Sequence, residues 1–194
     1  MTVRTRLVLL ALAITMCWGC SPVASGNLQT ESRTVPAAGV SAAIVDLTMG
    51  AGELEVTGGA QELLEADFTF NVARWTPDFQ VTQTGDRTTV QIEQGNGRIP
   101  LPSLGNSFNR WEIRLSPDVP LTLNVRLGAG NTLLQLGGLA LERLDVTMGA
   151  GEAEVDLTGP WERNLLVNVT GGVGQLRVEL PADVGVRASV SGGL

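Results

Sequence analysis

Apolar and polar residues alternate along this chain in short runs that meet at glycine-rich corners. The segment 146–157 reads VTMGAGEAEVDL, with apolar side chains at every second position on both sides of its Gly-Ala-Gly. A period of two is typical of a strand with one buried face, and glycine adopts backbone angles that a Cβ forbids. We therefore interpret the segment as strand, corner, strand, and expect Val155 and Leu157 to point into a core.

The same unit recurs. Copies surround Gly-Ala-Gly at 50–52 and 128–130, a degraded copy spans 168–174, and a fifth copy starts at 189–194. The predicted turn glycines are Gly50, Gly52, Gly128, Gly130, Gly149, Gly151, Gly172 and Gly174. Corner glycines at 128, 149, 172 and 193 are separated by 21, 23 and 21 residues. Self-similarity at this period indicates a solenoid, in which each turn covers the apolar face of its neighbour.

Stacked copies would align like positions into columns. The predicted inward columns are Leu134, Val155 and Val178, and Leu136, Leu157 and Leu180; the predicted outward column is Leu133, Glu154 and Arg177. Because neighbouring strands lie about 4.8 Å apart, this alignment places Glu154 beside Arg177.

The segment between the first two corners has a different pattern. Residues 64–72 alternate as a strand, and the runs 79–84 and 87–93 flank a Gly-Asp pair that indicates a hairpin. We expect a short helical turn at 61–66 and a surface loop at 95–109, which is rich in Gly, Pro, Asn and Ser. The predicted fold class is all-β: a β-solenoid-like stack of short strands with an antiparallel hairpin insertion.

Residues 1–19 have the anatomy of a signal peptide. Arg4 and Arg6 precede an apolar run, residues 7–18, that is shorter than the roughly 20 residues of a membrane-spanning helix. The run ends in Cys-Trp-Gly-Cys, which resembles the lipobox of bacterial lipoproteins and implies acylation of Cys20. An ordinary signal peptide and an uncleaved anchor are the alternatives. We expect residues 20–41 to be a lipidated N-terminus and flexible tether, and residues 42–194 to form the β domain.

The amino-acid composition excludes several kinds of chemistry. The chain has no His, Lys or Tyr, and its net charge is −7 at pH 7. Imidazole bases, imidazole metal ligands and Schiff-base lysines are therefore excluded, and an acidic surface argues against nucleic acid as a partner. Both cysteines lie in the leader, so they cannot form a disulfide framework or zinc site for the domain. We expect no cofactor and no metal.

Candidate reactive groups are few. The carboxylates that a carbohydrate-active enzyme on such a coil could use are Glu112, Asp118, Asp145 and Asp156, and each sits in ordinary strand alternation or beside Pro. The serines at 103, 107 and 116 have no histidine to activate them. Calcium needs 6–8 oxygen ligands, whereas Glu152 would stack with Asn131 and Gln175 rather than with more carboxylates.

The tryptophans are the candidates for surface binding. Trp75 and Trp161 could stack on sugars if they were exposed on one face, and Trp161 follows Gly-Pro at a predicted turn. Trp111 alternates with Ile113 and Leu115, which favours a place in the core.

Four segments together carry a family resemblance. LTMGAGELEVTGGA, ADFTFNVARWTPDF, RWEIRLSPDVPLTLNVRLGAG and VTMGAGEAEVDLTGP, in this order, resemble the bacterial toast rack domain of LiaF-like envelope-stress proteins and related adhesin-like proteins. The resemblance covers residues 42–194 and implies a parallel β coil with no established activity.

Three functions remain open at this stage. The first is a non-catalytic envelope lipoprotein with an adhesin-like binding or scaffolding domain, held to the membrane by its N-terminal lipid outside the cytoplasm and contacting an envelope protein or polysaccharide. The second is a LiaF-like regulatory partner of a stress-sensor kinase, and the third is a carbohydrate-active enzyme on a β-helix.

Overall fold

The structure is a computed structural model that describes residues 26–95, 107–182, 184 and 185. Strands dominate this part of the chain, with one short 3-10 turn, η1 (Ala73–Trp75). The strands are β1 (Gln29–Val35), β2 (Ala42–Gly58), β3 (Leu64–Phe70), β4 (Pro77–Thr84), β5 (Arg87–Gln94), β6 (Asn109–Leu115), β7 (Leu121–Gln135), β8 (Leu141–Asp156) and β9 (Leu166–Glu179).

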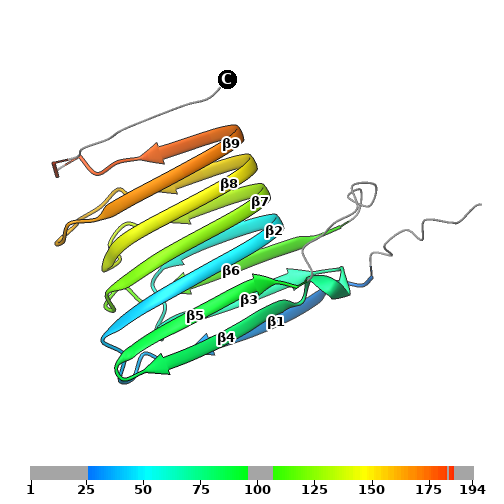
Figure 1. The fold of residues 1–194 in the computed structure, drawn as a ribbon, viewed down its shortest axis with the longest axis horizontal. Helices are drawn as coiled ribbons and strands as arrows, with labels where there is room; N and C mark the ends of the chain where they lie inside the picture. Colours follow the sequence, from blue (N-terminus) through cyan, green and yellow to red (C-terminus); the bar gives the residue numbers. More distant parts are fainter. Residues whose placement is uncertain (1–25, 96–106, 183, 186–194) are drawn as a thin grey trace, which may run out of the picture.

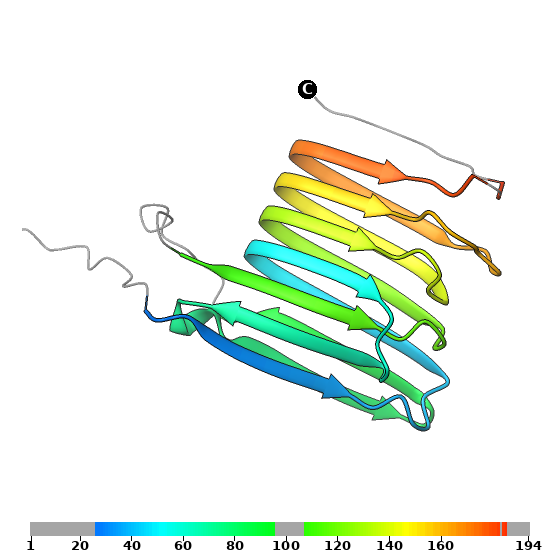
Figure 2. The same ribbon diagram turned by 180° about the vertical axis from the view of Figure 1, so that it is seen from behind.

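Four long strands, β2, β7, β8 and β9, each bend back on themselves at their glycine corner. Figure 1 shows these bends stacked at one end of the molecule, and Figure 2 shows the return halves from behind. The four strands are parallel and in register, with Ala51, Ala129, Ala150 and Val173 aligned at the corners. The predicted stack of coils is therefore confirmed.

The bends divide the sheet into two layers. The front layer, which faces the viewer in Figure 1, contains β4, β5 and the first halves of the four long strands. The back layer contains β1, β3, β6 and the second halves, and it faces the viewer in Figure 2. Side chains that point inward from the two layers form the core.

The order of the strands in space differs from their order in the chain. β5 pairs in parallel with the first half of β2, and β6 pairs in parallel with its second half. Together β5 and β6 make one coil, split at the position where the other coils have their glycine corner. β2 thus lies between this split coil and β7, although it precedes both in sequence.

Antiparallel strands complete the end of the stack next to the split coil. β4 pairs with β5 across Gly85-Asp86, as predicted for the hairpin, while β3 pairs with β6 and β1 pairs with β3. Phe68 of β3 lies edge-on to Trp111 of β6, with ring centroids 5.4 Å apart. Both rings are fully buried, so the aromatic side chains fill the core at this end.

The predicted columns are aligned, and their members are buried except on the last coil, where Val178 is 37% exposed. Leu134, Val155 and Val178 are aligned across β7, β8 and β9, and backbone hydrogen bonds from Leu136 to Asp156 and from Leu157 to Glu179 continue the stack beyond the strands. Leu157 is 2% exposed but Leu180, on the last coil, is 46% exposed. Within the described residues, the core is therefore closed inside the stack and exposed at its β9 end.

Two expectations were wrong. Residues 29–35 are not a tether: they form β1, so the β domain begins well before residue 42. β1 is an edge strand with mostly exposed side chains, which explains why its sequence lacks apolar alternation. Residues 61–66 form no helical turn, because β3 begins at Leu64.

Candidate functional surface

The predicted turn glycines form two columns at the bends. Gly52, Gly130, Gly151 and Gly174 have φ between 128° and 146°, a region that L side chains rarely adopt. Each of the last three also faces the backbone carbonyl of the glycine one coil earlier, and a Cβ there would overlap that oxygen. The other column begins at Gly50. In it, a Cβ on Gly128, Gly149 or Gly172 would likewise overlap the backbone carbonyl oxygen of the glycine one coil earlier. These glycines are therefore required by backbone packing.

The split coil closes its missing corner with side chains. Gln94, at the end of β5, accepts hydrogen bonds through Oε1 from the backbone N–H groups of Gly50 (2.8 Å) and Ala51 (3.1 Å). Asn109, at the start of β6, donates from Nδ2 to the carbonyl of Ala51 at 2.9 Å and accepts from Trp111 Nε1 at 3.1 Å. Both amides are buried. Neither residue is distinguished by the sequence pattern, because each lies at the border of an apparent loop.

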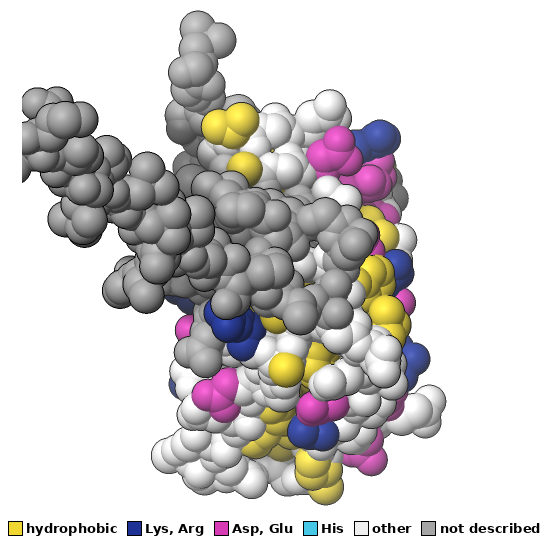
Figure 3. Space-filling model, turned by 90° about the vertical axis from the view of Figure 1, so that its right-hand side faces the viewer, with side chains coloured by type: hydrophobic (Ala, Val, Ile, Leu, Met, Phe, Trp, Pro, Cys, Tyr) yellow, Lys and Arg dark blue, Asp and Glu magenta, His cyan; other side chains and the backbone are white. Residues whose placement is uncertain are grey.

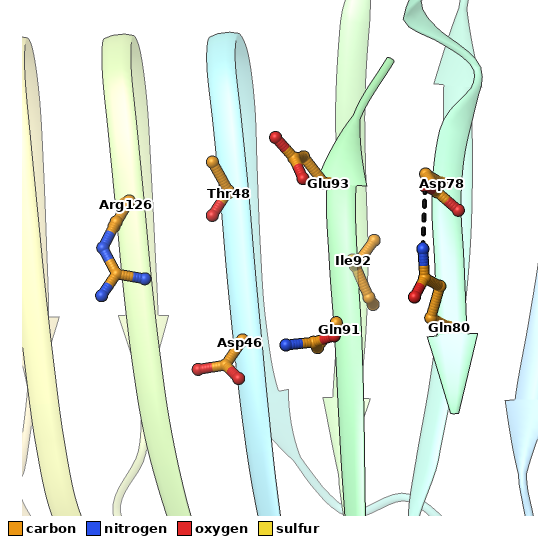
Figure 4. A pocket seen from close by; sticks show the side chains of 8 residues that line it. All are labelled: Asp46, Thr48, Asp78, Gln80, Gln91, Ile92, Glu93 and Arg126. Carbon is orange, nitrogen blue, oxygen red and sulfur yellow. Dashed lines mark hydrogen bonds between the residues drawn. The ribbon is translucent and has the colours of Figure 1, made fainter. Parts of the chain in front are cut away.

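A shallow depression of about 320 Å³ lies on the front layer. Figure 4 shows its side chains at two levels across four strands: Asp46, Gln91 and Gln80 at one level, and Arg126, Thr48, Glu93 and Asp78 at the next. Gln80 donates to Asp78 at 3.0 Å. Three carboxylates and a single guanidinium line the depression, so its local charge is negative.

The lower level of this depression continues across the whole front layer. Strand register aligns six side chains, one from each strand: Gln80, Gln91, Asp46, Asn124, Asp145 and Asn168. We call this row the amide ladder. Asn124 donates to Asp46 at 2.7 Å, and Asn168 donates to Asp145 at 3.1 Å. Every rung is a planar amide or carboxylate.

The back layer carries a more charged surface. Its depression, about 480 Å³, is lined by Glu53, Glu55, Glu152 and Glu154 together with Arg110 and Arg177. Arg110 bridges Glu53, Glu55 and Glu112 at 3.0–3.4 Å. In Figure 3, which looks onto the bends, basic and acidic side chains follow one another down the right-hand border of the molecule. The two faces of the domain thus differ in chemistry.

The tryptophans do not form a common binding surface. Trp75 is 4% exposed and packs in the core, so its predicted place on the surface is wrong. Trp161 is half-buried, packs against the core and donates from Nε1 to the carbonyl of Leu157 at 2.7 Å. Trp111 is fully buried, as its alternation predicted.

Three of the four candidate carboxylates have local partners. Glu112 pairs with Arg110 at 3.1 Å, and Asp118 is exposed in the turn before β7. The hydrogen bond from Arg143 lowers the pKa of Asp145 against the opposing effect of burial, and the hydrogen bond from Asn168 lowers it further. Hydrogen bonds from Thr158 lower the pKa of Asp156. A lowered pKa favours the ionised form, whereas a general acid needs a raised one.

Where the structure describes them, the other groups considered from sequence form no catalytic arrangement. Ser116 is buried and accepts a hydrogen bond from the backbone of Asp118 at 3.3 Å. Ser107 lies in the segment that leads into β6. Cys20, Ser103, the signal peptide and the fifth copy at 189–194 fall outside the described residues.

Glu152 stacks with Asn131 and Gln175, as predicted. Among the residues that the structure describes, no group of three His, Cys, Asp or Glu side chains is close enough together to hold a metal ion. No helix within the same ranges is long and apolar enough to cross a membrane.

Comparison with known proteins gives one family and several solved structures. Residues 24–179 match the family described as the N-terminal domain of toast_rack, DUF2154. A "putative cell adhesion protein" from Clostridium sporogenes superposes with a TM-score of 0.68 at 18% identity, over 79% of this chain and 100% of that one. This similarity supports the fold. A search of curated proteins gave no match.

Two further structures align over similar lengths but superpose poorly. A "putative adhesin" from Bacteroides fragilis is 10% identical over 78% of this chain and 97% of its own, with a TM-score of 0.27. A "putative lipid binding protein" from Parabacteroides distasonis is 9% identical over 77% and 97%, with a TM-score of 0.28.

Proposed function

This chain belongs to the toast-rack family, and from that premise we propose that it is a non-catalytic envelope protein whose β domain offers its two outer faces for binding. The observation that carries the proposal is the arrangement of polar groups. On both faces they lie in extended rows set by strand register. A reaction centre would instead bring an acid, a base or a nucleophile together at one point.

The interior supports the same role. Inward positions of the middle coils are filled by Leu, Val and Met side chains that are almost fully buried, among them Leu47, Leu123 and Leu144. Burial of each such side chain contributes roughly 1.5–3 kcal/mol. The described domain is thus a solid support for two surfaces, and its depressions are shallow features of those surfaces.

The proposed location follows from the leader. Cys20, at the end of a short apolar run that follows two arginines, would be acylated and become the new N-terminus. From Cys20 to the start of β1 at Gln29 the chain is short, so a lipidated domain would sit close to the membrane surface. The similarity to the "putative cell adhesion protein" from Clostridium sporogenes agrees with an extracytoplasmic location.

Mass spectrometry of the mature chain from a membrane fraction tests the location. We expect an N-terminal Cys20 that carries lipid. Cys20→Ser should abolish processing at this position, whereas the matched variant Cys17→Ser should be processed as the wild type is. A mature chain without lipid, or processing that Cys20→Ser leaves unchanged, would refute the lipoprotein proposal.

A further inference from the structure

The amide ladder on the front layer has a uniform chemistry that the core does not require. Its six rungs are Gln80, Gln91, Asp46, Asn124, Asp145 and Asn168, on six neighbouring strands. The rungs on β2, β5, β7 and β8 point outward, since both flanking residues of each are buried, as Val45 and Leu47 are beside Asp46. On the outer strands, Asn168 lies between two valines that pack against the core, and Gln80 is exposed. Asn124 donates to Asp46 and Asn168 donates to Asp145 within the row. Beside the row, Gln80 donates to Asp78 and Arg143 pairs with Asp145.

We propose that the amide ladder binds an uncharged, extended β-1,4-linked glycan that runs across the strands. The first argument is hydrogen-bond type. Amide rungs both donate and accept, whereas carboxylate rungs only accept. A sugar hydroxyl also both donates and accepts, so a polyhydroxylated chain matches a row in which the two kinds of rung are mixed. A basic peptide would need acceptors alone, and an anion would need donors alone.

The second argument is spacing. Rungs on neighbouring strands are about 4.8 Å apart, a step comparable with the advance of one ring in a flat β-1,4-linked chain. Such a chain presents hydroxyls at regular intervals along its edges. One ring per rung is therefore geometrically possible along the front layer, and affinity should grow with the number of rings that find a rung.

The third argument is charge. The depression of about 320 Å³ at one end of the ladder is lined by Asp46, Asp78 and Glu93, with Arg126 as the cation among its lining residues. An anionic polymer would be repelled there, whereas a neutral one would not. A depression of this size is at the lower limit of small-ligand sites, so it suits one or two rings at the end of a longer chain.

The rows of polar side chains on the two faces of the domain differ in composition. On the back layer, strand register aligns a row of five side chains: Arg110, Glu53, Asn131, Glu152 and Gln175. Arg110 forms ion pairs with Glu53 in this row and with the nearby Glu55. Four of the six front rungs are amides, against two of the five side chains in this back row, so the front row holds more groups that both donate and accept hydrogen bonds. The front layer is therefore the expected binding face.

Titration calorimetry of the purified chain with cello-oligosaccharides and chito-oligosaccharides of two to six rings tests this inference. We expect affinity to rise with length up to six rings in at least one series, and oligogalacturonides of the same lengths to bind more weakly. Asp46→Ala and Asn124→Ala should each weaken hexasaccharide binding about tenfold, the cost of one charge-assisted hydrogen bond. The matched back-face variants Asn131→Ala and Asp156→Ala should bind as the wild type does.

Thermal unfolding of each variant separates a binding role from a purely structural one. A ladder variant that keeps its melting temperature but loses binding supports the proposal. No binding by either hexasaccharide, binding without length dependence, or equal loss from front-face and back-face variants would overturn it. The inference rests on the proposed binding role, but acylation of Cys20 is measured separately, so the two proposals fail independently.

Discussion

Glu154 and Arg177 lie side by side in the register of β8 and β9, yet Arg177 forms its ion pair with Glu179 on its own strand, at 2.7 Å. The register is the one predicted from the repeat, while the pairing is not. Exposed ion pairs contribute only about 0–1 kcal/mol, so pairing of an exposed arginine with one neighbouring carboxylate rather than another changes the free energy little. Alignment of the coils must therefore come from the core and the corners.

The corner glycines should be the residues least tolerant of substitution. Gly130→Ala adds a Cβ at φ 131° directly against the carbonyl of Gly52. Strain and overpacking each cost about 1–3 kcal/mol, so we expect a loss of at least about 2 kcal/mol in urea unfolding. Gly138→Ala is the matched control: its φ is 79°, but a Cβ there would meet nothing within 4 Å. Equal losses would show that crowding by the preceding coil does not matter.

The open end of the core should tolerate truncation that the middle does not. Leu157 and Leu180 occupy the same column, but they are 2% and 46% exposed. Leu157→Ala should cost about 2–5 kcal/mol, the range for a buried leucine, and Leu180→Ala less than about 1 kcal/mol. Chemical denaturation of both variants measures the difference. A cost for Leu180→Ala as large as that for Leu157→Ala would mean that the β9 end is covered.

The buried amide of Gln94 should stabilise the split coil. Gln94→Ala removes the acceptor for the backbone N–H groups of Gly50 and Ala51. Loss of a partner for buried donors costs about 1–3 kcal/mol, which thermal or urea unfolding would detect. Gln91→Ala, an exposed position on the same strand, should change stability by no more than about 0.5 kcal/mol. Comparable effects at the two positions would argue against the role given to Gln94.

Acid should remove part of the stability that Asp145 provides. The hydrogen bond from Arg143 lowers its pKa below the ordinary value of 3.8. A lowered pKa stabilises the fold above the unfolded value and ceases to do so as pH falls through the folded value. Unfolding free energy should therefore decline below about pH 4, and Asp145→Asn should make this decline shallower by less than about 1 kcal/mol. An unchanged pH profile in the variant would show that ionisation of Asp145 does not contribute to stability.

The part of the fold that sequence could predict is the part set by alternation and glycine. Val155 and Leu157 point into the core, as their alternation with polar neighbours predicts. Glu154 and Arg177 are in register because each lies three residues after the last glycine of its corner. β1 could not be predicted in this way, because an edge strand buries little and needs no apolar alternation. Nor could the place of β2 between the split coil and β7, since only tertiary pairing sets it.

The candidate surface was predictable only in part. Trp75 was misplaced because a residue two positions before Pro at a strand break resembles an exposed turn, whereas its side chain at the end of η1 is buried in the core. Gln94 and Asn109 carry no signal, since their role is to replace a backbone corner that is missing from their own coil. The amide ladder crosses six strands from distant parts of the sequence, so it appears only once the register is known.

Disulfide trapping of neighbouring coils tests the central claim, which is that like positions of successive repeats lie directly beside one another. With Cys17 and Cys20 replaced by Ser, the pair Glu154→Cys and Arg177→Cys should oxidise readily without loss of stability, because aligned residues on adjacent strands are within disulfide range. The pair Glu154→Cys and Glu179→Cys, two residues out of register, should oxidise far more slowly. Preferential oxidation of the second pair would contradict the stacking of the coils.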